Sequence, residues 1–265
     1  MPELPDVEVF RQYVDATSLH HDIAAVHLHG SHLVDGVTPR TLRRHLNGHA
    51  LASTRRHGKY LFLKISKDPD WLLLHFGMTG LLKYYRVGDE PAYTKLRLDF
   101  ANGYSLAYIN KRKLGRIGLV RDLDQFIEAQ SLGPDPWAEE FDLEVFRSIL
   151  EGRRGTIKGL LMNQSAMAGL GNEYADEVLF QAGIHPQTPV DQLDEDTVRK
   201  LFDTMERVIR QAINARADVK RMPLTWLLPH RQREAPCPRC GGTVRRTEVS
   251  GRATYFCTRH QPEPD

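Results

Sequence analysis

The sequence predicts an α+β protein, with an antiparallel β-sandwich at the amino end, a helical domain after it and a zinc-bound β-hairpin at the carboxyl end. Before residue 110, short segments rich in β-branched and aromatic residues alternate with turns such as Asp68-Pro69-Asp70, which is typical of antiparallel strands. After residue 137 the apolar residues recur at helical spacing. All cysteines of the chain lie near its carboxyl end, spaced as in a metal site.

These patterns give the expected elements in order. A helix over about residues 6–17 precedes strands at 23–29, 60–65, 71–76, 95–100 and 104–109. Helices are expected at 139–150, 157–162, 173–182 and 195–215. The expected domains are 1–132, 137–228 and 229–265. A chain of 265 residues with 41% apolar residues can bury the cores that such domains need.

The sequence also bounds the location of the protein. No run approaches the roughly 18 to 20 uninterrupted apolar residues that cross a membrane, and the amino end lacks the pattern of a signal peptide. Cysteines reserved for a metal favour a reducing compartment. We therefore expect a cytoplasmic protein that does not bind membranes.

The metal site is indicated by two pairs of ligand residues, each separated by two positions. Thiolate and imidazole are preferred ligands of zinc, and four of them close a tetrahedral site with no open position for chemistry. Residues 243–256 between the pairs read as two strands around a turn at 249–251. We therefore expect one structural zinc ion per chain. Its expected ligands are Cys237, Cys240, Cys257 and His260, although a histidine here also fits a polar chain end.

The amino end offers a candidate nucleophile. The chain begins Met1-Pro2-Glu3, and removal of the methionine would leave Pro2 with a secondary amine that can form an iminium ion with an aldehyde-like carbon. An α-amino group titrates near ~8, so part of it is unprotonated at neutral pH, and Glu3 can transfer the protons that the attack requires. The same residues also fit an ordinary, proline-stiffened start of a chain.

Charge is segregated along the chain although the net charge is only +2. Residues 108–121 hold five basic and no acidic side chains, and residues 122–151 hold nine acidic side chains against one arginine. Residues 214–252 hold nine basic side chains against three acidic ones. This distribution favours an anionic partner such as a nucleic acid backbone; solvated charged faces are the alternative.

Three further features are candidates for binding. The glycines of Gly169-Leu-Gly-Asn172 precede the helix at 173–182, and the free N–H groups at such a helix start bind phosphate well. Met78 lies between glycines, where it could protrude or pack in a core. Lys59 is the last residue before an apolar strand, and its ammonium could reach a phosphate or simply extend into water.

Together these motifs resemble the formamidopyrimidine-DNA glycosylase and endonuclease VIII family of base-excision repair enzymes. The resemblance covers nearly the whole chain, and its motifs occur together in one order. It implies a β-sandwich domain, a helical domain with a helix-two-turns-helix motif, and a zinc finger, with damaged double-stranded DNA in the cleft between the domains. We expect a monomer associated with the nucleoid. The motifs are residues 2–8, 58–60, 75–80, 169–172 with Tyr174, 183–186 and the hairpin with Gly251-Arg252-Ala253-Thr254.

The resemblance also implies residue roles. Pro2 attacks C1′ of the damaged nucleotide and expels the base, while Glu3 transfers protons at the deoxyribose ring oxygen. Lys59 contacts phosphate and assists β-elimination, and Arg252 contacts the phosphate that departs in δ-elimination. Other residues fill the space left by the flipped-out nucleotide or hold the kinked DNA backbone. These expected DNA-binding residues are His75, Met78, Arg112, Leu114, Lys158 and Asn172.

The sequence departs from the family pattern at several points. The family often has phenylalanine where this chain has Leu114, an apolar residue where it has Glu173, and a fourth cysteine where it has His260. The segment 215–237 is shorter than in relatives that fold a loop over 8-oxoguanine. The preferred lesion, the opposite base and the form of the DNA, duplex, bubble or cross-linked, therefore stay open.

Two other classes of protein can be compared with this one. A tautomerase with an N-terminal proline would have no use for the zinc hairpin or the clustered arginines. A damaged-DNA or DNA-structure binding protein on the same fold stays open as an alternative, and so does removal of Met1, because a retained methionine would turn the Pro2 nitrogen into an amide.

Overall fold

The computed structural model describes residues 1–264, and its backbone contacts divide the chain into two compact units. The first unit comprises Met1–Pro2 and Asp6–Gln130, and the second comprises Glu3–Pro5 and the residues from Ser131 onward. Strands dominate the first unit and helices the second, so the α+β class is confirmed. The zinc region clusters with the helices; its treatment as a separate domain stays a prediction.

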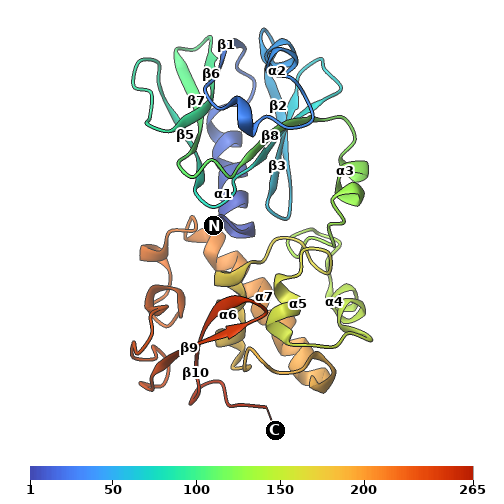
Figure 1. Ribbon diagram of the computed structural model, residues 1–265, viewed down its shortest axis with the longest axis vertical. Coiled ribbons are helices and arrows are strands. Elements are labelled where there is room, and N and C mark those ends of the chain that lie inside the picture. The colour runs from blue at the N-terminus through green and yellow to red at the C-terminus, as the bar shows by residue number, and fades with distance from the viewer. Residues whose placement is uncertain (265) are drawn as a thin grey trace. The chain divides into compact units, whose positions relative to one another are not determined.

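The first unit contains two four-stranded antiparallel sheets (Figure 1). Their strands are β1 (Ile23–Leu28), β2 (Leu51–His57), β3 (Tyr60–Ile65), β4 (Trp71–His75), β5 (Gly80–Arg86), β6 (Thr94–Phe100), β7 (Tyr104–Asn110) and β8 (Arg116–Val120). One sheet has the order β1-β6-β7-β5 and the other β2-β3-β4-β8. Leucines from both sheets, such as Leu63 and Leu72 from one and Leu98 and Leu106 from the other, share one buried cluster. The predicted sandwich is therefore confirmed.

Helices pack against this sandwich. They are α1 (Leu4–Thr17), α2 (Pro39–Leu46) and α3 (Leu123–Ala129). Val7 and Val14 of α1 are fully buried in the main cluster. Phe126 of α3 meets the rings of Tyr60 and Phe62 edge-on, at 5.3 and 5.6 Å between centroids. Strand β3 therefore has apolar residues on both faces.

Several elements of this unit were not predicted: β2, β5, β8, α2 and α3. In β2 the reason is charge, because a strand containing Arg55, Arg56 and His57 lacks the apolar alternation of a half-buried strand. The Arg56 side chain is nevertheless only 4% exposed, because its Nε lies 3.1 Å from Glu8 Oε2. This partner comes from α1, and the local sequence does not reveal it.

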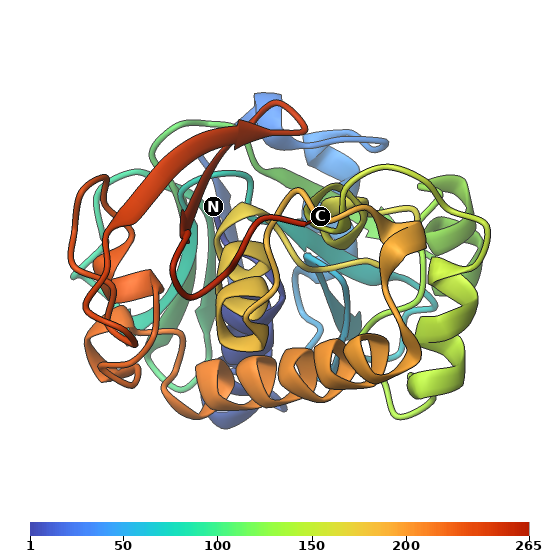
Figure 2. The same cartoon turned by 90° about the horizontal axis from the view of Figure 1, so that it is seen from below.

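The second unit contains the longer helices and the zinc hairpin. The helices are α4 (Leu143–Leu150), α5 (Ile157–Met162), α6 (Asn172–Ala182) and α7 (Glu195–Asn214), followed by strands β9 (Val244–Val249) and β10 (Arg252–Cys257). Figure 2 shows α7 lying across α6, and both contribute to one apolar cluster that includes Val178, Leu201 and Ile209. Helix α4 begins later than expected, because the Asp142 side chain caps it at the Val145 N–H. Among the described residues, no helix is long and apolar enough to span a membrane.

The hairpin forms as the sequence predicts. Val249 pairs with Arg252 across a two-residue turn, and the turn residues Ser250 and Gly251 have φ of 51° and 70°. Two successive residues with positive φ are typical of the tight turns that suit the twist of paired strands. Arg252 is thereby placed, exposed, at the end of the hairpin.

Candidate active site and metal centre

Glu3 is held in the second unit by the start of α6. It is only 2% exposed. Its Oε2 accepts the N–H groups of Gly171 at 2.7 Å and Tyr174 at 3.2 Å, and its Oε1 accepts that of Glu173 at 3.0 Å. A Cβ on Gly171 would lie 2.4 Å from Glu3 Oε1, so only glycine leaves room for the carboxylate. Three donors and the positive end of the helix dipole fix this carboxylate in one position.

This arrangement corrects one expectation. The sequence suggested that the N–H groups preceding and opening this helix would bind phosphate. They donate to the Glu3 carboxylate instead, so the anion at this helix start belongs to the protein itself. The glycines of the motif therefore serve to position a candidate acid–base group.

Pro2 belongs to the first unit and is half-buried. Pro2 is joined to the fixed Glu3 by a peptide bond. The predicted nucleophile and the predicted proton-transfer group are therefore adjacent residues in any conformation of the chain. Met1 precedes it, and in this form the Pro2 nitrogen is an amide. Nucleophilic chemistry at Pro2 therefore requires removal of Met1.

Lys59 and His75 lie close together in the first unit. Lys59 is 8% exposed, in the turn between β2 and β3, and His75 ends β4 opposite Tyr60. Burial lowers the pKa of His75 to about 4, and the charges of Lys59 and Arg116 add to this shift. His75 is therefore a neutral imidazole at physiological pH, which can donate a hydrogen bond to a phosphate but adds no positive charge.

Two loops of the first unit bring the predicted intercalating residues together. The turn after β4 carries Met78, which is 42% exposed, and the loop after β7 carries Leu114, which is 52% exposed, and the exposed Arg112. The Arg112 N–H donates to Thr79 Oγ1 at 3.1 Å. A Cβ on Gly77 would lie 2.3 Å from the Leu114 carbonyl oxygen, so the two backbones approach closely. Met78, Arg112 and Leu114 thus form one exposed group of apolar and cationic side chains.

Lys158 and Asn172, which were expected to contact the DNA backbone, instead bind groups of the protein itself. The Lys158 side chain is fully buried and its Nζ lies 2.6 Å from Asp176 Oδ1. The same Nζ donates to Asn172 Oδ1 at 2.8 Å and to Thr254 Oγ1 at 2.6 Å, and Asn172 Nδ2 donates to the Ala253 carbonyl at 3.0 Å. Their contacts with the DNA backbone stay a prediction. For Lys158, a contact with phosphate would require its ammonium to give up one of its present partners, Asp176, Asn172 or Thr254.

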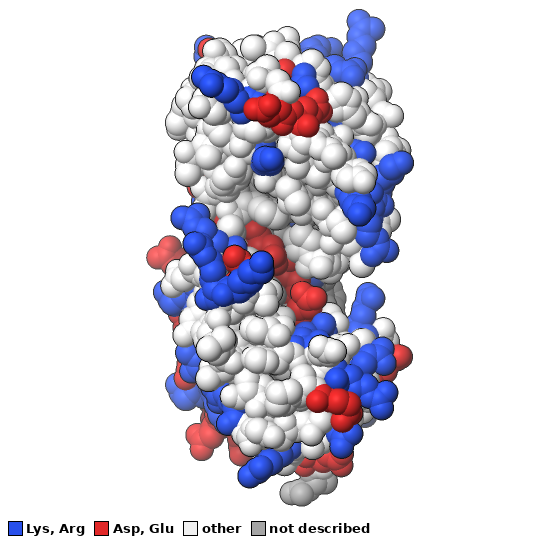
Figure 3. All heavy atoms as spheres, turned by 90° about the vertical axis from the view of Figure 1, so that its left-hand side faces the viewer, with Lys and Arg blue, Asp and Glu red and all other residues white. Residues whose placement is uncertain are grey.

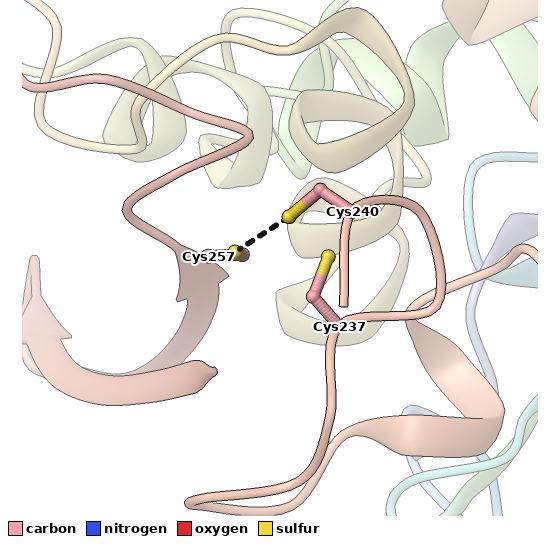
Figure 4. Close-up of side chains that lie close together, drawn as sticks. All are labelled: Cys237, Cys240 and Cys257. Carbon is pink, nitrogen blue, oxygen red and sulfur yellow. Dashed lines mark hydrogen bonds between the residues drawn. The ribbon is translucent and has the colours of Figure 1, made fainter. Parts of the chain in front are cut away.

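The three cysteines meet at the base of the hairpin (Figure 4). Their sulfur atoms all lie within 4.8 Å of one another, and Cys240 Sγ is 3.6 Å from Cys257 Sγ. Two thiolates on one zinc at about 2.3 Å each, in tetrahedral geometry, lie about 3.8 Å apart. Burial raises the pKa of the Cys257 thiol to about 11, and a divalent cation offsets that cost of a buried thiolate. The cysteines form the predicted zinc site.

The fourth ligand stays a prediction. Among the described residues, His260 does not join the group of ligand atoms within 4.8 Å. Its Nε2 lies 2.8 Å from the Phe180 carbonyl oxygen, and its ring packs on Phe180 with 4.9 Å between centroids. A histidine that ligates a metal commonly donates its other N–H to a carbonyl, so this contact leaves Nδ1 as the nitrogen available for zinc.

Sequence reasoning missed the buried polar residues that support the site. Asp176 and Glu177 of α6 are 1% and 0% exposed, and Gln261 is 1% exposed. Gln261 binds the Cys257 N–H through Oε1 and the Ile184 carbonyl through Nε2, which anchors the segment read as a free polar tail. The signal in the sequence was the position of the two acids, which stand side by side between Ala175 and Val178 within an apolar stretch of α6.

Basic and acidic side chains are mixed on the face drawn in Figure 3. Lys and Arg side chains lie at several points of the face drawn in Figure 3, interspersed with fewer Asp and Glu side chains. Several of the basic residues counted in the sequence are paired, such as Arg231 with Asp176 and Arg245 with Glu234. Sequence counts of basic residues therefore overestimate the charge that is available to an anionic partner.

The fold and the site define a class: a β-sandwich unit with an N-terminal Pro-Glu, and a helical unit that carries a zinc hairpin. Family models agree over nearly the whole chain. The formamidopyrimidine-DNA glycosylase N-terminal domain matches residues 1–117, the H2TH domain of the same enzymes matches residues 132–223, and the zinc finger found in FPG and IleRS matches residues 235–259.

Individual relatives give the same result. The formamidopyrimidine-DNA glycosylase of Acaryochloris marina is 33% identical over 99% of this chain and 100% of its own, and that of Moorella thermoacetica is 34% identical over 93% and 94%. Lactococcus lactis Fpg in complex with abasic-site DNA superimposes with a TM-score of 0.87 at 29% identity, covering 98% of this chain and 100% of its own. The chain belongs to the formamidopyrimidine-DNA glycosylase family of DNA repair enzymes.

Proposed function

We propose that the protein is a bifunctional DNA glycosylase and AP lyase that removes oxidised or ring-opened bases from damaged double-stranded DNA. One observation carries this proposal: the buried Glu3 carboxylate, fixed by three backbone N–H groups, directly follows Pro2 in the chain. A positioned acid–base group beside a terminal amine is what iminium catalysis requires. The complexes of Lactococcus lactis Fpg with abasic-site DNA and with Fapy-dG DNA support DNA as the partner, which implies a cytoplasmic location at the nucleoid.

The first half of the reaction is base release. With Met1 removed, the Pro2 nitrogen attacks C1′, and the bond between C1′ and the base breaks so that the base leaves with the bonding electron pair and takes up a proton. Glu3 takes up the proton that the Pro2 nitrogen loses on bonding to C1′ and delivers it to the deoxyribose ring oxygen as the ring opens. The product is an iminium ion between Pro2 and C1′, with the damaged base released.

Strand cleavage follows from this iminium. Loss of a C2′ proton and departure of the 3′ phosphate complete β-elimination, with Lys59 as the cation that contacts phosphate. Loss of a C4′ proton and departure of the 5′ phosphate complete δ-elimination, with Arg252 at the end of the hairpin contacting that phosphate. Water hydrolyses the remaining iminium and frees the Pro2 amine. The Met78, Arg112 and Leu114 group fills the space left in the base stack.

Borohydride trapping on abasic-site DNA tests the mechanism. The protein with Pro2 at its terminus, verified by intact mass, should become covalently joined to the DNA. A version in which an uncleaved N-terminal extension precedes Pro2 keeps every side chain but converts the nitrogen to an amide, so it should bind DNA and give no trapped product. Equal trapping by both versions would show that Pro2 is not the nucleophile.

A second function rests on the position of Met1 before Pro2. If the methionine stays in place in cells, the protein binds damaged DNA or a DNA structure without excising a base. Mass spectrometry of the protein purified from its own host distinguishes the two functions. A mature chain that begins at Pro2 excludes the binding-only form.

The substrate class follows from the segment between α7 and the first zinc ligand. Its residues Met222, Trp226 and Leu227 are 5%, 2% and 0% exposed and anchor the segment in the core, so only short exposed stretches, such as residues 223–225, are left to cover a flipped-out base. Discriminating 8-oxoguanine from guanine needs polar groups that close around the base. We therefore propose ring-opened purines or oxidised pyrimidines as better substrates than 8-oxoguanine. Single-turnover excision on matched duplexes tests this, and fastest release of 8-oxoguanine opposite cytosine would refute it.

A further inference from the structure

The structure contains a buried ionic network that the proposed mechanism does not use. Its centre is Asp176 of α6, whose side chain is fully buried together with that of Lys158 from α5. Lys158 Nζ lies 2.6 Å from Asp176 Oδ1. Arg231, from the segment before the zinc ligands, donates to Asp176 Oδ2 from Nε at 3.0 Å and from Nη2 at 2.8 Å. All of these residues belong to the second unit.

The same carboxylate also binds the zinc hairpin. Asp176 Oδ2 accepts the backbone N–H of Tyr255 in β10 at 3.1 Å. Around it, Lys158 Nζ donates to Thr254 Oγ1, and Arg231 Nη2 donates to the Ala253 carbonyl at 3.2 Å. The Arg231 guanidinium also lies over the Tyr255 ring, 4.6 Å from its centroid. Three consecutive residues of β10 are therefore tied to one buried acid and its two cations.

We propose that Asp176 is the positioning residue that docks the zinc hairpin on the helical unit and so fixes the place of Arg252. Arg252 begins β10, only three residues before the Tyr255 amide that Asp176 binds. The zinc ion closes the far end of the hairpin, at Cys257, and leaves the end that carries Arg252 to other contacts. The network supplies those contacts, since it binds residues 253, 254 and 255.

The proposal gives Lys158 a role different from the predicted phosphate contact. Its ammonium is surrounded by oxygens of Asp176, Asn172 and Thr254 and has no exposed surface. It links the start of α6, which holds Glu3, to the hairpin that carries Arg252. Burial raises the pKa of Asp176, and the charges of Lys158 and Arg231 act in the opposite direction, so the carboxylate depends on both cations.

The test is Asp176→Asn, which keeps the shape of the side chain and removes its charge. Lys158 then stays buried without its ion-pair partner, and Arg231 keeps only the exposed Glu173, whose Oε1 lies 3.9 Å from its Nη1; a buried cation that has lost its partner is strongly destabilising. We expect amide hydrogen exchange at residues 253–255 to accelerate on the order of 100-fold, with one zinc per chain retained. Arg231→Met is a milder variant that leaves the Lys158 and Asp176 pair intact, and about tenfold faster exchange at the same amides is expected. It keeps the test valid if Asp176→Asn does not fold.

The control is Arg245→Gln in the same hairpin. Arg245 is an exposed cation of β9 that pairs with Glu234 at 3.2 Å and has no contact with the network among those described. It should leave exchange at residues 253–255 unchanged. Unchanged exchange in both Asp176→Asn and Arg231→Met would refute the docking role, whatever the enzyme does.

The consequence for Arg252 rests on the proposed function and needs its own measurement. On abasic-site DNA, Arg231→Met should lower the fraction of β,δ-elimination product at least tenfold relative to the β-elimination product, while borohydride trapping stays within about threefold of wild type. A purely structural role would lower both equally. An unchanged product ratio in spite of faster exchange would refute the link to Arg252. Absence of trapping in the wild-type protein would instead refute the proposed function and leave the exchange result standing.

Discussion

The two units present their functional side chains in opposite ways. In the first unit the candidate DNA contacts Met78, Arg112 and Leu114 stand exposed on two loops that are held by backbone contacts. In the second unit the Glu3 carboxylate, the Lys158 ammonium and the Asn172 amide each hydrogen-bond to other groups of the protein. Exposed loops suit a ligand that must be contacted and released, whereas a fixed carboxylate suits chemistry at one atom. The comparison predicts that substitutions in the second unit affect stability and chemistry together, and that substitutions in the loops affect binding alone.

The largest effect is expected from loss of the metal. Cys257→Ser should release the zinc and unfold the hairpin, because small zinc lobes gain on the order of 10 kcal/mol from the metal. Metal analysis and hydrogen exchange over β9 and β10 measure this. Arg252→Ala is the matched control, which should keep one zinc per chain. Active protein without zinc would overturn the assignment of the site.

Glu3→Gln should have the next largest effect. The amide has one oxygen for three N–H donors and brings an NH2 group against them, so both stability and proton transfer suffer. We expect base release to fall at least 100-fold and cleavage of a pre-formed abasic site to fall less, because that site already contains the open-chain aldehyde. Single-turnover rates on the two substrates measure the difference. Equal losses on both would contradict the assigned division between base release and cleavage.

The two units should also respond to pH in opposite directions. Burial raises the pKa of Glu177 to about 7, against hydrogen bonds from Gln181, Leu227 and Leu228 and the charge of Arg239. A folded-state pKa above the unfolded value means that the native state binds the proton more tightly. Stability from this group is present at low pH and is lost as pH rises from about 4.5 to 7, by about 3 kcal/mol at most.

His75 in the first unit has the reverse sign. Its folded pKa of about 4 lies below the value of 6.5 in the unfolded chain. The unfolded state therefore takes up the proton first, and stability is lost as pH falls from 6.5 to 4, again by about 3 kcal/mol at most. Urea unfolding between pH 4.5 and 8, followed by exchange in each unit, measures both slopes. Glu177→Gln should remove the first slope and His75→Gln the second; slopes of equal sign in the two units would contradict this assignment.

Much of the fold was predictable because local patterns carry it. The hairpin turn at Ser250-Gly251, the helix α5 and the cysteine spacing all follow from residue types close together in sequence. The missed features depend on distant partners. Arg56 is buried in a strand only because Glu8 lies beside it, and the start of α6 is occupied only because Glu3 reaches it. In both cases the partner is distant in sequence, so the pattern of apolar and polar residues around Arg56 or around the start of α6 does not reveal it.

The candidate site divides in the same way. The identities of Pro2, Glu3 and the cysteines follow from sequence, whereas Lys158 was assigned to the DNA backbone by the family resemblance, and nothing near it in the sequence indicates that its side chain is buried. Lys158 can be buried because its ammonium pairs with Asp176, a buried acid on the next helix. The network of Asp176, Lys158 and Arg231 spans three segments and could be found only in three dimensions.

The smallest effect on stability is expected in the exposed loops. Arg112→Ala should change the free energy of unfolding by no more than about 0.5 kcal/mol, as for other surface sites. If the side chain contacts a phosphate, the dependence of log Kd on log salt concentration should become shallower by about one unit. Binding titrations at several salt concentrations measure the slope. An unchanged slope would assign Arg112 to the base stack rather than to the backbone.

Leu114→Ala is the matched apolar change in the same loop. Leu114 is 52% exposed, so its removal should cost the fold little and leave the salt slope of wild type. Its expected effect is on insertion beside the flipped-out nucleotide, seen as weaker binding to damaged DNA at every salt concentration. If Arg112→Ala and Leu114→Ala differ in the salt dependence of Kd but not in the free energy of unfolding, the loops of the first unit contribute to DNA binding and not to folding. A loss of stability above about 1 kcal/mol in either variant would show instead that these loops support the sandwich, and the contrast between the units would fail.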